Sequence, residues 1–156
     1  MNRKAPYWYI ATWFGSGLSP VASGTAGSLA ALPFAWLIHD YAGNFGLFSA
    51  SILIFFCGCW ASAEYLKHHP STKDPGEIVV DEVAGQWLVL SVLPQSLAYY
   101  AMGFFLFRLF DVIKIWPASW ADKHMEGALG VMLDDLFAAL QAMLAASLFY
   151  LALHGS

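Results

Sequence analysis

The sequence predicts an all-α fold: a polytopic integral membrane helical bundle of about four to five membrane helices with a polar cytoplasmic-face site. Of the 156 residues, 59% are hydrophobic and only 12% are charged, whereas a soluble domain carries about a quarter charged residues. Seven Trp, seven Tyr and twelve Phe are typical of a protein with aromatic side chains at both membrane interfaces. The charges also gather in short islands, which leaves four charge-free stretches: 5–39, 41–63, 83–107 and 136–156.

The first half of the chain predicts a glycine-rich loop followed by two apolar helices. Residues 15–28 are rich in Gly, Ser and Pro and are expected to form a loop that ends at a helix. An apolar helix then runs from about Ser28 to Ile38, where Pro33 can introduce a kink, and Gly43-Asn44 forms a turn. Residues 45–63 are the clearest membrane span, because a crossing helix needs about 20 mostly apolar residues.

The second half contains one clear span and one ambiguous segment. A polar loop covers residues 68–76, and residues 136–153 form another apolar span. The 83–107 stretch is either one span or a helical hairpin that turns at Pro94-Gln95-Ser96. With the hairpin, the chain crosses five times and all seven Lys and Arg residues lie on one side, as the positive-inside rule favours. The hairpin is therefore preferred, although residues 83–93 would rise only about 16 Å, less than the ~30 Å hydrocarbon core.

Composition and cysteine usage exclude several other classes of protein. No internal repeat or linker interrupts the chain, so residues 1–156 are expected to form a single membrane-embedded domain. The net charge of −4 argues against nucleic acid as a partner, because binding it requires a basic surface. Cys57 and Cys59 lie in an apolar run and are expected to be buried thiols. No removable signal peptide is recognised after Arg3-Lys4.

Two consecutive pairs of acids stand at the edges of charge-free runs. Asp81 and Glu82 come directly before residues 83–107, and Asp134 and Asp135 come directly before the last run. The helix dipole explains one acid at a helix start, but it does not explain a pair. Small residues that follow each pair would let other helices approach closely: Gly85, Ala138 and Ala139.

Arg108, Asp111 and Lys114 recur every three residues and therefore lie along one stripe of a helix. This stripe is either a ladder of salt bridges at the membrane interface, or two cations for phosphate oxygens with an acid for a metal. The carboxylates gathered on one membrane face would repel one another unless a cation lies among them, and all-oxygen ligation suits Mg²⁺. Ionisable groups at membrane depth generally indicate function.

The segment Gly24-Thr25-Ala26-Gly27-Ser28 directly precedes the first expected helix. Free backbone N–H groups at a helix N-terminus, beside small residues and hydroxyls, bind phosphate well. Such segments also occur simply as capped helix starts. Beside a magnesium site with Arg and Lys at the membrane surface, the segment indicates phosphoryl chemistry on a lipid headgroup.

Together, these segments resemble the phosphatidylglycerophosphatase A family of bacterial membrane lipid phosphatases. The resemblance implies a phosphoric monoester hydrolase that needs Mg²⁺ and hydrolyses phosphatidylglycerophosphate to phosphatidylglycerol and inorganic phosphate in glycerophospholipid biosynthesis. It also implies a multi-pass protein of the bacterial cytoplasmic (inner) membrane with its active site facing the cytoplasm. The segments that carry it are FGSGLSP (14–20), GTAGSLAALP (24–33), DPGEIVVDEVAGQW (74–87), FRLFDVIKIWP (107–117) and GVMLDD (130–135).

The resemblance further implies a role for each matching polar residue. Departures from the family pattern at Ser23, Ile115 and Glu126-Gly127 affect the geometry of loops rather than the chemistry. The expected catalytic residues are Asp81, Glu82, Arg108, Asp111, Lys114, Asp134 and Asp135. The expected Mg²⁺ ligands are Glu82, Asp134 and Asp135, followed by Asp81 and Asp111; the expected contacts of the substrate phosphate are Thr25, Gly27, Ser28, Arg108 and Lys114.

Three alternatives remain open at this point. The substrate could be another lipid or isoprenoid phosphate, or the chain could be a non-catalytic membrane subunit. A small ion-coupled transporter would also place acids within a membrane, but near the midplane and with no need for Arg108 and Lys114. His68 and His69 are expected at the surface rather than as proton donors, and direct attack by water is expected rather than a covalent intermediate. No oligomeric state is predicted.

Overall fold

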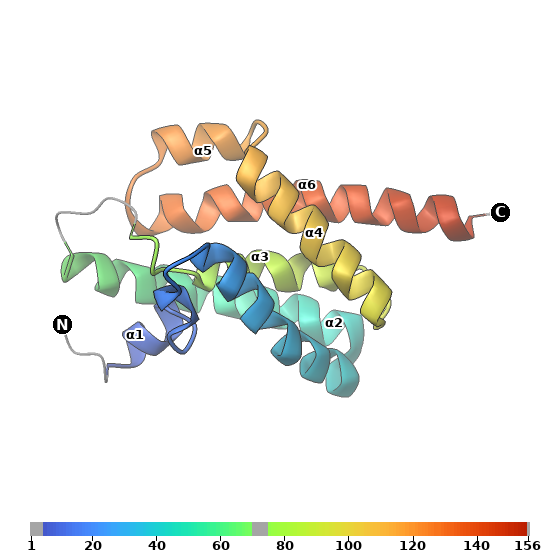
Figure 1. Cartoon of the computed structure of the whole chain (residues 1–156), viewed down its shortest axis with the longest axis horizontal. Coiled ribbons are helices and arrows are strands. Elements are labelled where there is room, and N and C mark those ends of the chain that lie inside the picture. The colour runs from blue at the N-terminus through green and yellow to red at the C-terminus, as the bar shows by residue number, and fades with distance from the viewer. Residues whose placement is uncertain (1–4, 70–74, 156) are drawn as a thin grey trace.

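The structure, a computed structural model, describes residues 5–69 and 75–155, and these residues are helical with no strand among them. The all-α prediction is therefore confirmed for the described residues. Figure 1 shows the elements in order. They are α1 (Pro6–Ala11), the short 3-10 helix η1 (Ser16–Leu18), α2 (Ser23–Lys67), α3 (Val80–Leu90), α4 (Leu97–Ile113), α5 (Ala118–His124) and α6 (Gly127–His154).

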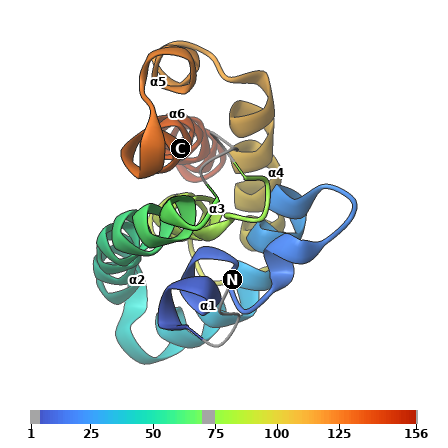
Figure 2. The ribbon, with the colours of Figure 1, turned by 90° about the vertical axis from the view of Figure 1, so that its left-hand side faces the viewer.

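Helix α3 forms the centre of the bundle. The view along the bundle in Figure 2 shows α3 enclosed by α2, α4 and α6. Apart from Glu82, every residue of α3 is buried. This explains why the segment is apolar on all sides, since a helix that contacts protein all round needs no polar face. At 11 residues α3 rises about 16 Å, which is too short to cross a ~30 Å hydrocarbon core.

Helix α2 consists of two helical halves separated by a break at Gly43. The backbone of Gly43 (φ 64°, ψ −167°) is not helical, and glycine adopts such a conformation readily because it has no Cβ. The predicted turn at this position is confirmed. Pro33 lies inside the first half, where the backbone stays helical, and Gly43 is the residue of α2 at which it does not.

The loop expected over residues 15–28 is only partly correct. Helix α2 already begins at Ser23, five residues before the expected start, and η1 occupies part of the remaining loop. The physical reason is close packing: a Cβ added at Gly27 would lie 2.6 Å from the Cβ of Val79, just before α3. Small residues here let the first turns of α2 lie against the start of α3, and this tertiary packing outweighs their weak helix propensity.

The 83–107 stretch forms two helices rather than one. Helices α3 and α4 are separated by a turn over residues 91–96, and Ser96 caps α4 by accepting a hydrogen bond from the backbone N–H of Tyr99 (3.3 Å). Two helices joined by a turn are therefore confirmed and a single continuous helix is wrong, whereas the five membrane crossings expected with the hairpin stay a prediction. Pro94 explains the break, because proline disfavours helical backbone in the residue before it.

A partly buried polar network joins this turn to the break in α2. His39 is hydrogen-bonded through Nδ1 to the hydroxyl of Tyr100 and through Nε2 to Oδ1 of Asn44, both at 3.1 Å. The amide nitrogen of Asn44 donates to the carbonyls of Ser91 (2.8 Å) and Leu93 (3.0 Å). The side chain of Asn44 thus satisfies two backbone carbonyls of the α3–α4 turn that would otherwise be left unpaired.

Asn44→Ala is expected to destabilise the fold by about 1–3 kcal/mol, because it leaves buried carbonyls and His39 without their partner. The measurement is unfolding of the purified protein in detergent. Ser49→Ala is the matched control, since Ser49 is exposed and its hydroxyl bonds only the carbonyl of Phe45 in the same helix. Equal stability of the two variants would contradict the structural role assigned to Asn44.

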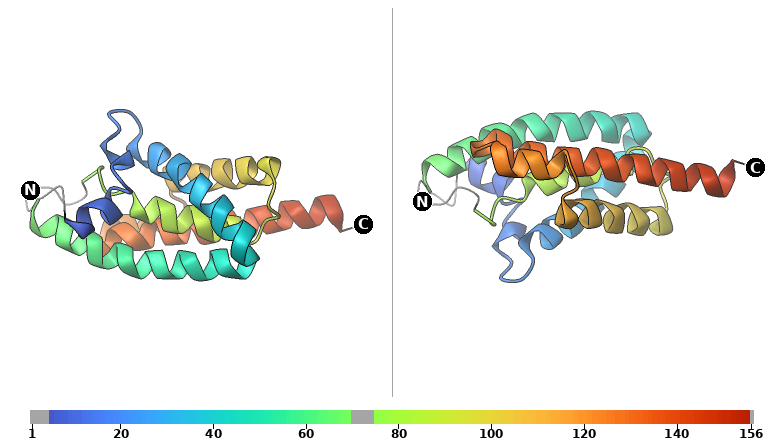
Figure 3. Two further views of the ribbon diagram at one scale, coloured as in Figure 1. Left: turned by 90° about the horizontal axis from the view of Figure 1, so that it is seen from below. Right: turned by 90° about the horizontal axis from the view of Figure 1, so that it is seen from above.

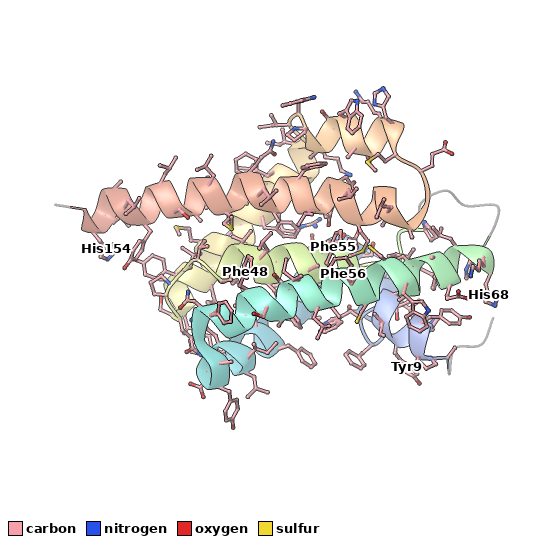
Figure 4. The ribbon with its side chains drawn as sticks, turned by 180° about the vertical axis from the view of Figure 1, so that it is seen from behind. Tyr9, Phe48, Phe55, Phe56, His68 and His154 are labelled. Carbon is pink, nitrogen blue, oxygen red and sulfur yellow. The ribbon has the colours of Figure 1, made fainter. Side chains whose placement is uncertain are left out.

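Two helices, α2 and α6, are long and apolar enough to cross a membrane. The surface agrees with this property, because large apolar side chains are exposed in numbers that water-soluble proteins avoid. Phe45 is 81% exposed and Phe56 66% exposed, and Figure 4 shows Phe48, Phe55 and Phe56 along the second half of α2. These features indicate a membrane protein.

The two ends of the bundle are formed by different segments of the chain. The ends of α2, the start of α3, α5 and the start of α6 lie toward one end, while the break in α2, the α3–α4 turn and the C-terminus lie toward the other (Figures 1 and 3). His68 and His154 mark these opposite ends in Figure 4. The positive charges of Arg3, Lys4 and Lys73, which also entered the sidedness prediction, and residues 70–74 of the predicted polar loop lie outside the described residues.

Candidate active site

Three carboxylates, two of them on buried residues and one on the partly buried Glu82, converge where α3 meets α6. Asp81 and Glu82 lie in the first turn of α3, and each offers an oxygen within 4.8 Å of an oxygen of the other and of Asp135 on α6. We call these three residues the carboxylate trio. In each of them one oxygen is buried and has no hydrogen-bond partner among the described residues: Asp81 Oδ1, Glu82 Oε2 and Asp135 Oδ2.

Such an arrangement is electrostatically unfavourable unless a positive charge joins it. Asp81 and Glu82 lie outside the two candidate membrane-spanning helices. Burial, followed by the charge of Glu82, raises the pKa of Asp81 well above its usual range. Burial also raises the pKa of Glu82 to about 6. A divalent cation bound by the unpaired oxygens would offset both the loss of hydration and the mutual repulsion.

Small residues bring the acids together. A Cβ added at Gly85, one turn after Asp81, would lie 2.6 Å from the ring of Phe107 on α4 and 3.3 Å from Ala139 on α6. Ala138 and Ala139 are themselves buried. The close approach predicted from these small residues is confirmed, and it places the first turn of α3 directly against Asp135.

Arg108 and Asp111 form an ion pair one turn apart on α4. The guanidinium also faces the carboxylate trio, since Arg108 Nη1 lies 3.8 Å from Glu82 Oε1. Asp111 is buried, and the Nε of Arg108 is buried without a hydrogen-bond partner among the described residues. Two of the three residues expected in the stripe thus lie together on α4, with the arginine directed at Glu82, whereas Lys114 follows the helix with left-handed backbone.

Lys114, at the end of α4, does not pair with Asp111, the acid three residues before it, but with two acids of other helices. Its ammonium donates to Asp122 on α5 (2.9 Å) and to Asp134 on α6, and no bond joins it to Asp111 in the described structure. Burial alone would lower the pKa of Lys114, but hydrogen bonds to Asp134 and Asp122 raise it instead. The side chain therefore stays charged.

Asp134 lies outside the carboxylate trio, although it was expected among the first metal ligands. One of its oxygens accepts from Lys114 and the other accepts from the backbone N–H of Asp135 (2.9 Å). Asp134 was expected to bind metal ahead of Asp81, whereas the unpaired oxygens belong to Asp81, Glu82 and Asp135. The acid pair also lies about two turns inside α6, which begins at Gly127, and not at a helix start as expected.

The segment expected to bind phosphate is the first two turns of α2 rather than a loop. Gly24 lies close to Glu82 and Arg108, because a Cβ there would lie 2.3 Å from Glu82 Oε1 and 3.1 Å from both terminal nitrogens of Arg108. The first N–H groups of a helix lack partners within it, so this end of α2 presents free donors beside Arg108. Thr25 is half-buried in the same turn.

Gly27 and Ser28 lie deeper than the phosphate-binding prediction implied. Gly27 packs on Val79, and the hydroxyl of Ser28 is buried without a hydrogen-bond partner among the described residues. His68 is exposed and stacks on Tyr7 with ring centroids 5.2 Å apart, in agreement with the expected surface position. His69 is half-buried and stacks on Tyr65 at 4.4 Å.

Two polar residues near the site were not among the sequence-based candidates. Gln86 is fully buried, and neither its amide oxygen nor its amide nitrogen has a partner among the described residues. Gln86 follows Glu82 by four residues in an apolar run, and this spacing could have placed it on the same helical face as Glu82. Asp122, which holds Lys114, gave no comparable signal because the pairing depends on how α5 folds back over α6.

Comparisons with known proteins find similar sequences over most of the chain. The family model for phosphatidylglycerophosphatase A matches residues 9–150. A phosphatidylglycerophosphatase A of Escherichia coli is 37% identical over 145 residues, covering 90% of this chain and 81% of that protein. The protein of the same name from Haemophilus influenzae is 35% identical over 142 residues, covering 89% and 85%.

A third relative carries a different name. This protein of Bacteroides thetaiotaomicron, provisionally named a phosphatidylinositol-3-phosphatase, is 35% identical over 149 residues and is covered over 87% of its length. No solved structure matches the chain significantly.

Proposed function

The chain belongs to the phosphatidylglycerophosphatase A family and is a phosphatase, and we propose that it hydrolyses phosphatidylglycerophosphate to phosphatidylglycerol and inorganic phosphate. One observation carries this proposal furthest. The unpaired oxygens of the carboxylate trio lie beside Arg108 and the free N–H groups of α2. Cation-binding oxygens next to phosphate-binding donors suit phosphoryl transfer.

The residues present fit Mg²⁺. Asp81, Glu82 and Asp135 would hold it, since they supply buried oxygens that lack other partners, and Mg²⁺ prefers such ligands. When bound, Mg²⁺ supplies charge for the phosphate oxygens and makes a coordinated water more acidic. Asp111 and Asp134, the other expected ligands, are engaged by Arg108 and Lys114 and serve to orient those cations.

The chain's own cations and N–H groups bind the phosphate. Arg108 presents a planar set of donors to the phosphate oxygens, with Asp111 fixing its orientation. The N–H groups in the first turn of α2, which includes Thr25, add donors and the positive end of a helix dipole. Lys114, held between Asp122 and Asp134, stabilises negative charge as the phosphate leaves.

We further propose a multi-pass arrangement in the bacterial inner membrane, with the site facing the cytoplasm. The two halves of α2, then α4 and α6, would contact lipid, while α3, enclosed among them, and the turn after it carry the chain from the site end of the bundle to the other end. The described cations Lys67, Arg108, Lys114 and Lys123 lie on segments at one end of the bundle, and the positive-inside rule assigns that end to the cytoplasm.

A second candidate function is hydrolysis of another lipid phosphate. The similarity to the Bacteroides protein supports it, since that relative is named for a phosphoinositide rather than phosphatidylglycerophosphate. Both substrates are phosphomonoesters on a glycerophospholipid, and the same cations and carboxylates would serve either. The transporter alternative is less well supported, because the acids lie beside Arg108 and Lys114 rather than alone at mid-membrane.

Phosphate release by the purified chain tests the proposal. In detergent with Mg²⁺, release is expected from phosphatidylglycerophosphate, at a higher kcat/KM than from phosphatidylinositol 3-phosphate or phosphatidic acid, and EDTA is expected to abolish it. A preference for phosphatidylinositol 3-phosphate would support the second candidate. Full activity in EDTA would contradict the magnesium site, and no release from any of these lipids would contradict the proposed reaction.

A further inference from the structure

An apolar groove of about 550 Å³ runs between the first half of α2 and α4. Both views in Figure 3 place these two segments side by side. The buried rings of Tyr100 and Phe104 form the floor of the groove, and its lining is almost wholly apolar. The walls include Leu29, Pro33 and Trp36 from α2 and Leu97, Ala101 and Phe105 from α4.

One end of the groove leads directly to the phosphate-binding donors. Phe105 lies one turn before Arg108 on α4, and Leu29 lies about one turn after Thr25 on α2. Beyond this end, a Cβ added at Gly24 would lie 3.1 Å from both terminal nitrogens of Arg108 and 2.3 Å from Glu82 Oε1. The apolar groove therefore ends next to the corner where Arg108, the N-terminus of α2 and the carboxylate trio meet.

The other end of the groove is bridged by protein. The rings of Trp36 and Tyr100 pack edge to face with centroids 5.0 Å apart. The side-chain amide of Gln95 donates to the carbonyl of Trp36 (3.0 Å), which ties the α3–α4 turn to α2. A bound molecule would therefore enter the groove from the side or from the end near Arg108. The bridge limits how far it can extend along the groove.

The distance from Arg108 to the far end of the groove suits one leaflet of a bilayer. From Arg108 to Leu97, α4 rises about 16 Å, and one leaflet contributes about 15 Å of a ~30 Å hydrocarbon core. A lipid with its phosphate at Arg108 would therefore place an acyl chain along the groove as far as Trp36 and Leu97.

We propose that this groove binds one acyl chain of the phosphomonoester lipid substrate, an inference that rests on the proposed function. An apolar channel ending at a guanidinium and a helix N-terminus matches a molecule with an anionic head and an apolar tail. A neighbouring apolar membrane helix would offer no anionic group to Arg108 and the helix N-terminus. Because lipid tails are as apolar as the groove, the groove adds little affinity and serves mainly to position the phosphate.

Filling the groove tests this inference. Ala101 is an exposed wall residue, and Ala101→Trp would fill the groove while leaving the carboxylate trio and Arg108 in place. The ratio of kcat/KM for long-chain over short-chain phosphatidylglycerophosphate is expected to fall about tenfold or more, because a misplaced phosphate reacts slowly. Ala152→Trp adds the same bulk at an exposed alanine near the end of α6 and should leave this ratio unchanged. Equal losses for both chain lengths, or the same change in Ala152→Trp, would overturn the inference.

A second measurement separates this inference from the proposed reaction. Phosphatidylglycerophosphate with a photoactivatable group in one acyl chain is cross-linked to the protein in EDTA, and the labelled peptides are identified by mass spectrometry. Labelling of the groove is expected to exceed that given by the corresponding phosphatidylglycerol probe and to be lost in Ala101→Trp. Equal labelling by both probes would overturn the groove as a substrate site. If wild type releases no phosphate but the phosphatidylglycerophosphate probe still labels the groove more than the phosphatidylglycerol probe, the proposed reaction is contradicted and the acyl-chain site is supported.

Discussion

Asp135→Asn is expected to lower Mg²⁺-dependent phosphate release by about 10²–10³-fold or more, as loss of one electrostatic group in an active site commonly does. The residue supplies one of the three buried oxygens that lack partners, and it is the one that comes from α6. Asparagine keeps the shape of the side chain but removes the charge that would hold a cation. The measurement is the initial rate of release at saturating Mg²⁺.

A stability measurement distinguishes loss of the ion from loss of the fold. In EDTA, Asp135→Asn should be at least as stable as wild type, because one of several repelling buried carboxylates is gone. Added Mg²⁺ should raise the apparent Tm of wild type, since an ion that binds only the folded state stabilises it, and should raise that of the variant much less. Asp40→Asn, at an exposed acid outside the site, is the control. Equal Mg²⁺ stabilisation of wild type and Asp135→Asn would contradict the carboxylate trio.

The candidate acids could be found from the sequence because consecutive charges at the edge of apolar runs are costly unless they function. The sequence could not, however, tell which of these acids lie together in space. Which oxygen of Asp134 or Asp135 faces α3 depends on the rotation of α6 about its axis, and neighbouring residues on a helix point about 100° apart. That rotation directs Asp135 to the trio and Asp134 to Lys114.

In the fold, too, features set by local backbone preferences could be predicted, and features set by tertiary packing could not. Gly43 and Pro94 marked the two chain reversals correctly, since their backbone preferences are local and strong. The start of α2 was missed because Gly24 and Gly27 are weak helix formers, and they are helical through contacts with Glu82, Arg108 and Val79. Those contacts join segments far apart in the sequence, and no local pattern reports them.

Arg108→Gln is expected to abolish most activity, about 10³-fold, comparable to the loss of an arginine that stabilises a transferring phosphoryl group. Arg108 is the described cation that faces both Glu82 and the first turn of α2. Interpretation of this single variant is complicated by Asp111, which is buried and would lose its counterion. Breaking such a pair costs about 3–5 kcal/mol of stability, so a loss of activity alone could reflect unfolding.

The double variant Arg108→Gln/Asp111→Asn resolves this ambiguity. Removing both charges of a buried pair is close to neutral for stability, so the double variant should regain the Tm lost in Arg108→Gln. Its phosphate release should nevertheless stay as low as that of the single variant, because neither amide can supply the positive charge that the phosphate needs. Lys123→Gln, which removes an exposed cation from α5, should leave activity and Tm unchanged. Recovery of activity together with stability in the double variant would show that Arg108 only neutralises Asp111, and phosphate binding would then rest on Lys114 and the first turn of α2.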